Sequence, residues 1–410
     1  MAERFPCLPW RLLIVTLINN MSSGRYGSRD SGENVAREPV KSKIVLLADK
    51  KEEYRTLRAE HTARQEKATY VSLAEARQNK LNVDWKKTKI TKPALLGIKA
   101  WHDYPLQEIS NFIDWSPFFL TWELKGKYPE ILNHAKYGDE ARTLFKDAQN
   151  LLKRILHEKF LTARAVVGLF PANTVHDDDI EIYADDSRKK ILTTFHMLRQ
   201  QLQKAPGDAN LCLSDYIAPK DSGIKDYFGG FVCTTGIGIE KIVPAYEKAH
   251  DDYNAIMMKA LADRLAEAFA EHLHQRVRKE LWGYAKEESL SNEDLIRVKY
   301  KGIRPAPGYP ACPEHTEKEL LFDLLEAEKN AGVSLTESYA MLPAASVAGF
   351  YLGYPDSKYF SVGKVNRDQA EDYARRKGMD TASAEKWLSP FLAYSPGANS
   401  AVTRMFYEGR

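Results

Sequence analysis

The sequence predicts an α+β fold, in which an antiparallel sheet is flanked by separate helices. Of the 410 residues, 44% are hydrophobic and 28% are charged, a composition typical of a globular protein with a sizeable core. Several short β-rich runs are separated by short turns and lack the regular strand–helix–strand spacing of a parallel sheet. In one longer segment, from Met257 to Leu281, the apolar residues recur at helical spacing instead. Helices segregated from an antiparallel sheet are the mark of the α+β class.

The expected strands are rich in β-branched and aromatic residues and are bounded by turn-forming residues. They cover residues 166–170, 180–183, 335–341 and 346–352. Between the second and the third run, apolar residues repeat every four positions from Met257 to Leu281. We therefore expect a long helix that opens after Pro244 and ends near Trp282.

The distribution of charge and composition divides the chain into segments. Residues 41–92 contain 14 basic and 7 acidic residues, a local charge of +7, whereas residues 93–410 have a net charge of −5. Residues 1–40 are rich in Asn, Ser, Gly and charge and show no period, which is typical of a segment without a stable fold. We expect an ill-ordered leader at 1–40, a helical connector at 41–82 with its helix at 48–64, a folded domain at 83–395 and a tail at 396–410. Nothing before residue 83 is expected to contribute to the core.

The overall charge, the cysteines and the apolar runs indicate which partners and which compartment to expect. A net charge of +3 on 410 residues is too small for a nucleic-acid-binding footprint, so we expect no nucleic-acid partner. The four cysteines are few and far apart, which favours a reducing compartment and a cytoplasmic location. The longest apolar run near the N-terminus, residues 12–18, is far shorter than the roughly 20 residues of a membrane span. We expect no membrane association.

Potential metal ligands occur only as half-motifs. Glu271 and His274 have the E-x-x-H spacing of half a di-iron site, but the chain contains no second copy, so we reject that site. His272 lies on a different side of the expected helix from His274. Cys312 and His315 have the spacing of half a zinc site, again without the other half. The sequence therefore predicts no metal site.

Two further motifs are weak signals of function. Residues 233–240 contain a G-x-G pattern without the third glycine of a dinucleotide-binding loop, and we expect a turn there. Three carboxylates at 177–179 precede a strand, where they could meet a cationic substrate but more often form part of a turn. No G-x-S-x-G elbow is present, so serine-triad catalysis has no support. We assign no catalytic residue.

The segment 302–315 differs in kind from these motifs. It contains four prolines and two glycines in fourteen residues, which fix an irregular but stiff backbone. Arg304 could bind a carboxylate with its planar guanidinium, Ala306 and Gly308 allow close approach of a flat ligand, and Tyr309 could stack on it. The segment is thus a candidate for a preorganised binding loop, and the alternative is a proline-braced surface loop.

Several segments in the same order resemble the reactivation domain of cobalamin-dependent methionine synthase. The loop R-P-A-P-G-Y-P-A-C-P-E-H-T-E-K is similar to the loop with which that family binds S-adenosylmethionine. The other matching segments are NFIDWSPFFLTWELKGKYP (111–129), VVGLFPAN (166–173), DDIEIY (178–183), the helix at 250–284, LTESYAMLPAASVAG (335–349), PDSKYF (355–360) and DQAEDYARRKGM (368–379). The resemblance spans about residues 83–395.

The resemblance implies a curved α+β domain that binds S-adenosylmethionine in a shallow groove. In that family the domain presents the sulfonium methyl group to an oxidised, inactive cobalamin while a flavodoxin-type partner supplies an electron. The ligand-binding positions that the family motifs imply in this chain are Asp114, Glu267, Arg304, Ala306, Gly308, Tyr309, Tyr359 and Phe360. An anionic side chain for the ammonium, an arginine for the carboxylate and aromatic rings for the adenosine suit that ligand.

The chain also departs from the family pattern. Just before the loop, where the family often has a glutamate, Val298 cannot ionise. The D-x-H-x-x-G signature of the cobalamin module is absent, as are the homocysteine and folate modules, so cobalamin is expected only on a partner. We expect a reactivation domain that serves a synthase in trans or as a piece of a split synthase, and that does not make methionine alone. The alternative is a sensor that binds S-adenosylmethionine without methyl transfer; an independent small-molecule methyltransferase is weaker, because no general base is evident.

Overall fold

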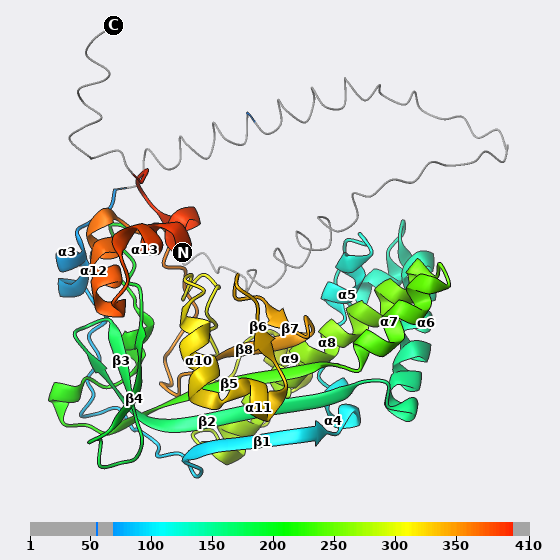
Figure 1. Cartoon of the computed structure of the whole chain (residues 1–410), viewed down its shortest axis with the longest axis horizontal. Coiled ribbons are helices and arrows are strands. Elements are labelled where there is room, and N and C mark those ends of the chain that lie inside the picture. Colours follow the sequence, from blue (N-terminus) through cyan, green and yellow to red (C-terminus); the bar gives the residue numbers. More distant parts are fainter. Residues whose placement is uncertain (1–54, 56–68, 397–410) are drawn as a thin grey trace, which may run out of the picture.

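A six-stranded antiparallel sheet lies at the centre of the structure, a computed structural model that describes Arg55 and residues 69–396 (Figure 1). The strands follow the order β4–β3–β2–β5–β8, and β1 also pairs with β2. Their bounds are β1 (Gly97–Tyr104), β2 (Thr162–Val175), β3 (Asp179–Tyr183), β4 (Ile191–His196), β5 (Asp226–Ile237) and β8 (Ser346–Tyr351). A small second sheet pairs β6 (Ser334–Leu335) with β7 (Met341–Leu342).

Strand β2 is the longest strand and pairs with three others. Along one edge, residues 163–169 pair with β1 and residues 172–175 pair with β3, while the other edge pairs with β5 over most of its length. Residues 165–174 of β2 are all buried, because helices cover both faces of the sheet. This explains why the run at 166–170 is continuously apolar rather than alternating.

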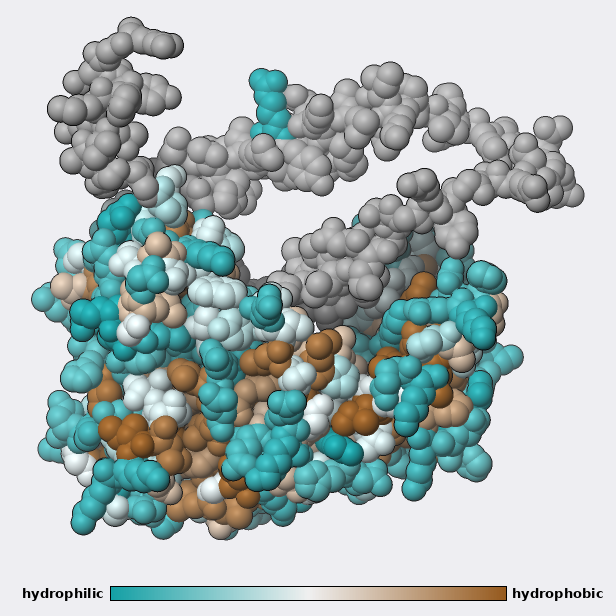
Figure 2. Space-filling model, viewed as in Figure 1, coloured by the Kyte–Doolittle hydropathy of each residue, from teal (hydrophilic) through white to brown (hydrophobic). Residues whose placement is uncertain are grey.

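Two hydrophobic cores lie on opposite faces of the sheet. On one face, Val167 and Leu169 pack with the long helix α8 (Asp252–Arg276). On the other face, Val166 and Phe170 pack with α10 (Glu317–Leu325) and α11 (Ala327–Ala331). Successive residues of a strand point to opposite faces, so one strand serves both cores. Figure 2 shows the side that carries α10 and α11, where hydrophobic residues gather in patches across the lower half and hydrophilic residues surround them.

The remaining helices cover the ends and edges of the sheet (Figure 1). The α-helices are α3 (Leu73–Gln78), α4 (Leu106–Ser110), α5 (Ser116–Thr121), α6 (Gly138–Glu158), α7 (Ile239–Lys248), α9 (Asn292–Ile296), α12 (Arg367–Lys377) and α13 (Thr381–Leu388). Short 3-10 helices are η1 (Glu130–Asn133), η2 (Leu213–Tyr216), η3 (Lys220–Ser222) and η5 (Ser389–Phe391), and α8 continues into a π-helical turn, η4 (Val277–Leu281). Helices α12 and α13 form a third, smaller core.

The predicted α+β class with an antiparallel sheet and surrounding helices is confirmed, and the runs at 166–170, 180–183 and 346–352 lie in β2, β3 and β8. Two details differ. Only the ends of the run 335–341 pair, because the residues between them form a turn closed by a bond from Thr336 to Ala340. The predicted long helix is divided: α7 contains Pro244, and α8 begins afresh after Asp251, whose side chain caps Asn254. The helix predicted at 48–64 lies outside the described residues, apart from Arg55.

Residues 70–80, which we predicted as part of the connector, pack against the folded domain. Leu73 and Ala76 of α3 are 4% and 0% exposed, and the backbone of Val71 bonds to Gln201. Arg77 forms ion pairs of 2.7 Å with Asp178 and with another carboxylate on α12. This contradicts the expectation that nothing before residue 83 contributes to the core. The predicted leader, and nearly all of the predicted tail, lie outside the described residues.

In the described part of the chain, no helix combines the length and the apolar character needed to cross a membrane.

Candidate functional site

The loop 302–315 is held by backbone hydrogen bonds to neighbouring segments. Ile303 forms an antiparallel bridge with Leu352, directly after β8, with both bonds at 3.0 Å. The carbonyl of Pro305 accepts from the amide of Phe350 at 2.7 Å. Further along, the carbonyl of Pro310 accepts from residue 362 at 2.8 Å. Although proline lacks a donor, its carbonyl still pairs, so the loop continues the sheet edge with a fixed backbone.

Gly308 occupies a turn that only glycine fits. Its φ is +90°, its amide donates to the carbonyl of Cys312 at 2.7 Å, and a Cβ at this position would lie 2.5 Å from the ring of His315. We predicted that this glycine allows a ligand to approach. His315 occupies the space into which a Cβ would project, so the turn itself already requires glycine, and the approach of a ligand to this backbone stays a prediction.

Helix α8 faces the loop with a row of acidic side chains. Asp263, Glu267 and Glu271 are spaced four residues apart and therefore share one side of the helix. Burial raises the pKa of the Tyr309 hydroxyl, and the nearby charges of Glu267 and Asp263 raise it further. Arg264 pairs with Asp263 at 2.5 Å. The acidic row and the loop thus enclose one polar site.

Arg304 is the most highly connected side chain of this site. Its Nη2 pairs with Glu271 Oε2 at 2.7 Å, and its Nη1 donates to the hydroxyl of Tyr300 at 3.1 Å and to His274 Nδ1 at 3.3 Å. Its backbone amide donates to the hydroxyl of Tyr359 at 3.0 Å. Burial opposes the charge of Arg304, but Glu271 and the two tyrosines raise the pKa of the guanidinium well above its ordinary value. Arg304 is therefore a fixed cation.

His274 supports Arg304 as a neutral base. Its side chain is fully buried, and burial together with the nearby guanidinium groups of Arg278 and Arg304 lowers the pKa of the imidazole well below its ordinary value. Because Nδ1 accepts from Arg304, the remaining proton is assigned to Nε2, which lies 3.5 Å from the hydroxyl of Tyr284. The histidine therefore links Tyr284 to Arg304.

Two buried polar atoms at the centre of the site have no hydrogen-bond partner in the structure. They are Oε1 of Glu271 and Nε of Arg304. Glu271 is only 7% exposed. Leaving a buried charged group unsatisfied costs free energy, so such atoms are expected to bond to a ligand or to ordered water. The ion pair of these two residues thus has one acceptor and one donor that remain free for a ligand.

Glu267, the middle carboxyl of the acidic row, has a raised pKa. Burial raises the pKa of its carboxyl to about 7; Asp263 and Glu271 raise it too, while Arg264 and Arg304 act in the opposite direction. The carboxyl is thus half ionised near neutral pH in the free protein. A bound cation would favour its ionised form.

The structure brings most of the predicted site residues together. Glu267, Arg304 and Tyr309 surround the polar site, and the hydroxyl of Tyr359 lies 3.4 Å from that of Tyr300. Asp114, between α4 and α5, accepts from the amide of Ser116 at 2.9 Å and lies close enough to Arg264 to raise its pKa. The side chain of Ala306, beside Arg304 in the loop, is 2% exposed.

Phe360 lies in a different environment. Its ring packs edge-on against Tyr216 at 6.4 Å, beside the core that contains α10. The neighbouring backbone of Val362 bonds to Pro310 of the loop. Phe360 thus lies close in sequence to a segment that is bonded to the loop, and its contact with the ligand stays a prediction.

Sequence reasoning missed Glu271, His274 and Tyr300 as members of the site. It treated Glu271 and His274 only as half of a metal motif, whereas the structure uses both as partners of Arg304. The four-residue spacing from Glu267 to Glu271 was a signal that both share one helix face. Within the described residues, no group of three or more His, Cys, Asp or Glu side chains is arranged to hold a metal ion.

His272 and the acidic cluster at 177–179, which the sequence offered as possible ligand sites, bond to other side chains of the domain. His272 bonds to the hydroxyl of Tyr104 at 2.7 Å. In the acidic cluster at 177–179, Asp178 pairs with Arg199 at 2.8 Å as well as with Arg77, and Asp179 pairs with Arg376. These carboxylates neutralise buried arginines rather than forming an open cation site.

Comparisons with known proteins agree with this architecture. The family model described as "Vitamin B12 dependent methionine synthase, activation domain" matches residues 105–378. A crystal structure of the MetH reactivation domain bound to AdoHcy (S-adenosylhomocysteine) is similar to this chain, with 55% sequence identity and a TM-score of 0.78. The similarity covers 80% of this chain and 99% of that one.

Proposed function

Because the chain belongs to the family of vitamin B12-dependent methionine synthase activation domains, we propose that it binds S-adenosylmethionine at Arg304 and methylates inactive cobalamin on a partner. The observation that carries this proposal is the position of Arg304 between carboxylates of α8, with a donor and an acceptor atom left unpartnered. A guanidinium and a carboxylate complement the two charges of a zwitterionic amino-acid group.

The charge of the site also supports this ligand. Four carboxylates, Asp114, Asp263, Glu267 and Glu271, face two guanidinium groups, Arg264 and Arg304, so the site has two excess negative charges when every group is ionised. S-adenosylmethionine carries a carboxylate, an ammonium and a sulfonium, a net charge of +1. An excess of negative charge favours this cation over the neutral product, S-adenosylhomocysteine.

We assign roles to the predicted residues on this basis. Arg304 binds the ligand carboxylate, and Asp114 and Glu267 bind the positive ammonium and sulfonium groups. Tyr309 and Tyr359 pack against the adenosine, and the backbone of Ala306 and Gly308 borders it. Phe360, next to Tyr359, is the remaining predicted ligand position.

The reaction that these roles serve is a methyl transfer to cobalt. One electron from a flavodoxin-type partner reduces cob(II)alamin, and the reduced cobalt then attacks the sulfonium methyl group. The S–CH3 bonding pair stays on sulfur, S-adenosylhomocysteine leaves, and no proton is transferred. The domain thus holds the donor in line and needs no general base of its own. The partners of this proposal are a cobalamin-carrying synthase fragment and the flavodoxin, in the cytoplasm.

The test uses the full chain in trans. A synthase fragment that carries cobalamin but lacks its own reactivation domain is mixed with S-adenosylmethionine, reduced flavodoxin and increasing amounts of the chain. Methylcobalamin formation is followed by absorbance. The rate should rise with chain concentration up to the millimolar range, because a separate protein lacks the effective concentration of a linked domain.

Matched variants complete the experiment. Asp114→Asn and Arg304→Ala should slow methylation, whereas Lys146→Glu, an exposed position on α6, should not. A rate that does not depend on chain concentration would reject the reactivation role. Ligand binding without any methylation would support the sensor function instead.

A further inference from the structure

A separate cavity is lined in part by Lys301, three residues before Arg304. Its volume is about 620 Å3, within the range of small-molecule sites. One wall is formed by residues 85–91, and the opposite wall by residues 282–286 and 353–355. The indole nitrogen of Trp282 donates to the carbonyl of Thr91 at 2.8 Å, which fixes the first wall to the second.

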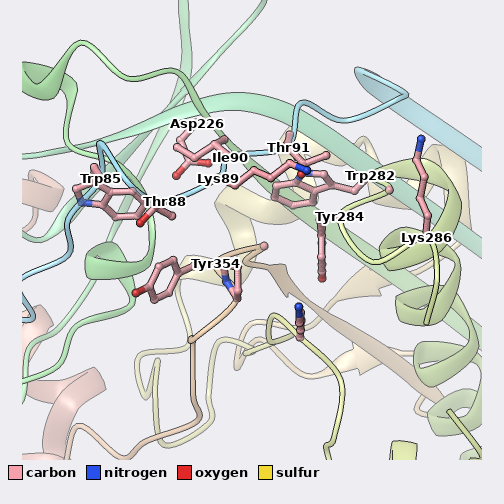
Figure 3. Close-up of a pocket in the computed structure, with 14 residues that line it drawn as sticks. Trp85, Thr88, Lys89, Ile90, Thr91, Asp226, Trp282, Tyr284, Lys286 and Tyr354 are labelled. Carbon is pink, nitrogen blue, oxygen red and sulfur yellow. The ribbon is translucent and has the colours of Figure 1, made fainter. Parts of the chain in front are cut away.

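Aromatic rings line both ends of this cavity (Figure 3). Trp85 and Tyr354 form one pair, with ring centroids 5.6 Å apart, and Trp282 and Tyr284 form the other, at 5.4 Å. Tyr354 is held from behind by Tyr216, which stacks on it at 5.8 Å. Trp282 is only 3% exposed, so the half-buried pair of Trp85 and Tyr354 offers the apolar surface on which a planar ligand can stack.

The charged side chains of the cavity are mainly positive. Lys89, Lys286 and Lys301 line it, and none of the three forms an ion pair with another described residue. The one carboxylate among the lining residues is Asp226, which is 7% exposed and accepts from the amides of residues 218 and 227 at 2.8 and 2.7 Å. The carboxylate is therefore occupied by backbone donors, and the three ammonium groups remain available for an anion.

We infer that this cavity binds a nucleotide that carries at least two phosphate groups. Its planar base would stack on the pair of Trp85 and Tyr354, and its phosphates would contact the three lysines. Stacking of bases on aromatic side chains and contact of lysine with phosphate are two interactions by which proteins bind nucleic acids without sequence preference. The inference does not depend on the proposed function, because no residue assigned to S-adenosylmethionine lines this cavity.

The two sites are close, and this decides which variants are informative. Tyr284 lines the cavity and also contacts His274, the partner of Arg304. Replacing Tyr284 would therefore disturb both sites. The lysines are exposed and lack ion pairs among the described residues, so their replacement should leave the fold and the Arg304 site intact.

The experiment titrates ADP into the full chain by calorimetry, with S-adenosylhomocysteine present at saturation so that adenosine binding at the Arg304 site is blocked. ADP should bind at one saturable site, and adenosine should bind at least about tenfold more weakly, because it lacks the phosphates. The Lys286→Glu/Lys301→Glu variant should weaken ADP binding at least about tenfold. The matched control, Lys146→Glu/Lys153→Glu, has the same change in net charge on the distant helix α6 and should bind ADP like the parent.

Each other result would overturn the inference. Absence of saturable ADP binding, or its abolition by S-adenosylhomocysteine, would show that the cavity takes no nucleotide. Equal binding of adenosine and ADP would show that the lysines do not contact phosphate. Equal weakening by both lysine pairs would show only general attraction by surface charge. In each variant, an unchanged affinity for S-adenosylhomocysteine confirms that the Arg304 site is intact.

Discussion

Raising the pH from about 6 to about 8 should strengthen the binding of S-adenosylmethionine about tenfold. The pKa of Glu267 is raised to about 7 in the free protein, chiefly by burial. If only the ionised carboxyl binds the cation, the observed dissociation constant is the intrinsic constant divided by the ionised fraction. That fraction rises from about 0.1 to about 0.9 over this range, which corresponds to about 1.4 kcal/mol. Near pH 7, binding should release about half a proton.

The other groups around Glu267 should not produce this pH dependence. Arg264 and Arg304 remain charged, the tyrosine hydroxyl of residue 309 has a raised pKa, and His274 remains neutral. In the ligand-free protein, raising the pH lowers the stability of the fold through the same carboxyl. Its raised pKa means that the folded state binds the extra proton, so the free energy of unfolding falls as the pH rises from about 4.5 to about 7.

Calorimetry at several pH values, in buffers with different ionisation enthalpies, measures both the affinity and the released protons. Glu267→Gln should bind more weakly at about pH 8 and should lose most of the pH dependence. A parent protein whose affinity is flat between these pH values would refute the role of Glu267. A Glu267→Gln variant that keeps the full tenfold change would assign the titration to another group.

Three further predictions concern affinity and stability. Arg304→Ala should weaken S-adenosylmethionine binding by about 1.5 to 3 kcal/mol, because the ligand carboxylate loses its cation. It should also lower the melting temperature, because Glu271 stays buried without its partner. Equal affinities of parent and variant in calorimetric titrations would show that the loop is only structural. Deleting residues 1–80 should lower the melting temperature more than deleting residues 1–68, because burial of Leu73 alone contributes about 1.5 to 3 kcal/mol. Identical melting curves of the two truncated proteins would show that α3 does not stabilise the domain. Val298→Gly should raise the free energy of unfolding by about 1 kcal/mol, because a β-branched residue at φ +56° is strained. Arg297→Gly, at φ −83°, should instead lower it in the same denaturation assay.

Local patterns predicted the sheet and helices because periodicity is a property of neighbouring residues. The run at 166–170 and the repeat from Met257 onward depend on neighbours within the same element. The predicted start of the helix after Pro244 was wrong, because Asp251 caps a new helix six residues before the repeat begins. The packing of α3 was missed for a related reason. Only Leu73 and Ala76 of that helix are buried, and Arg77 finds its partners about 100 and 300 residues away.

The candidate site was predictable only in part. The prolines indicated a stiff loop, and its backbone is indeed fixed by bonds to β8 and to the residues that follow it. The ion-pair partner of Arg304 could not be predicted from neighbouring residues, because Glu271 precedes it by 33 residues in the sequence. The two side chains come into contact only when α8 packs on the sheet. The strain at Val298 likewise depends on the chain path between α9 and the loop, and valine carries no signal for a positive φ.

Helix α8 carries both the acidic row and much of one core, and this limits how the site can be redesigned. Leu261 and Phe269 are fully buried on the same helix that presents Glu271. A library that varies α8 would lose most of its members to misfolding before any could be selected for a new ligand. Tyr309 and Tyr359 stand on irregular segments outside the helix. Engineering of an altered donor preference should therefore begin at these two tyrosines and leave α8 as the fixed scaffold.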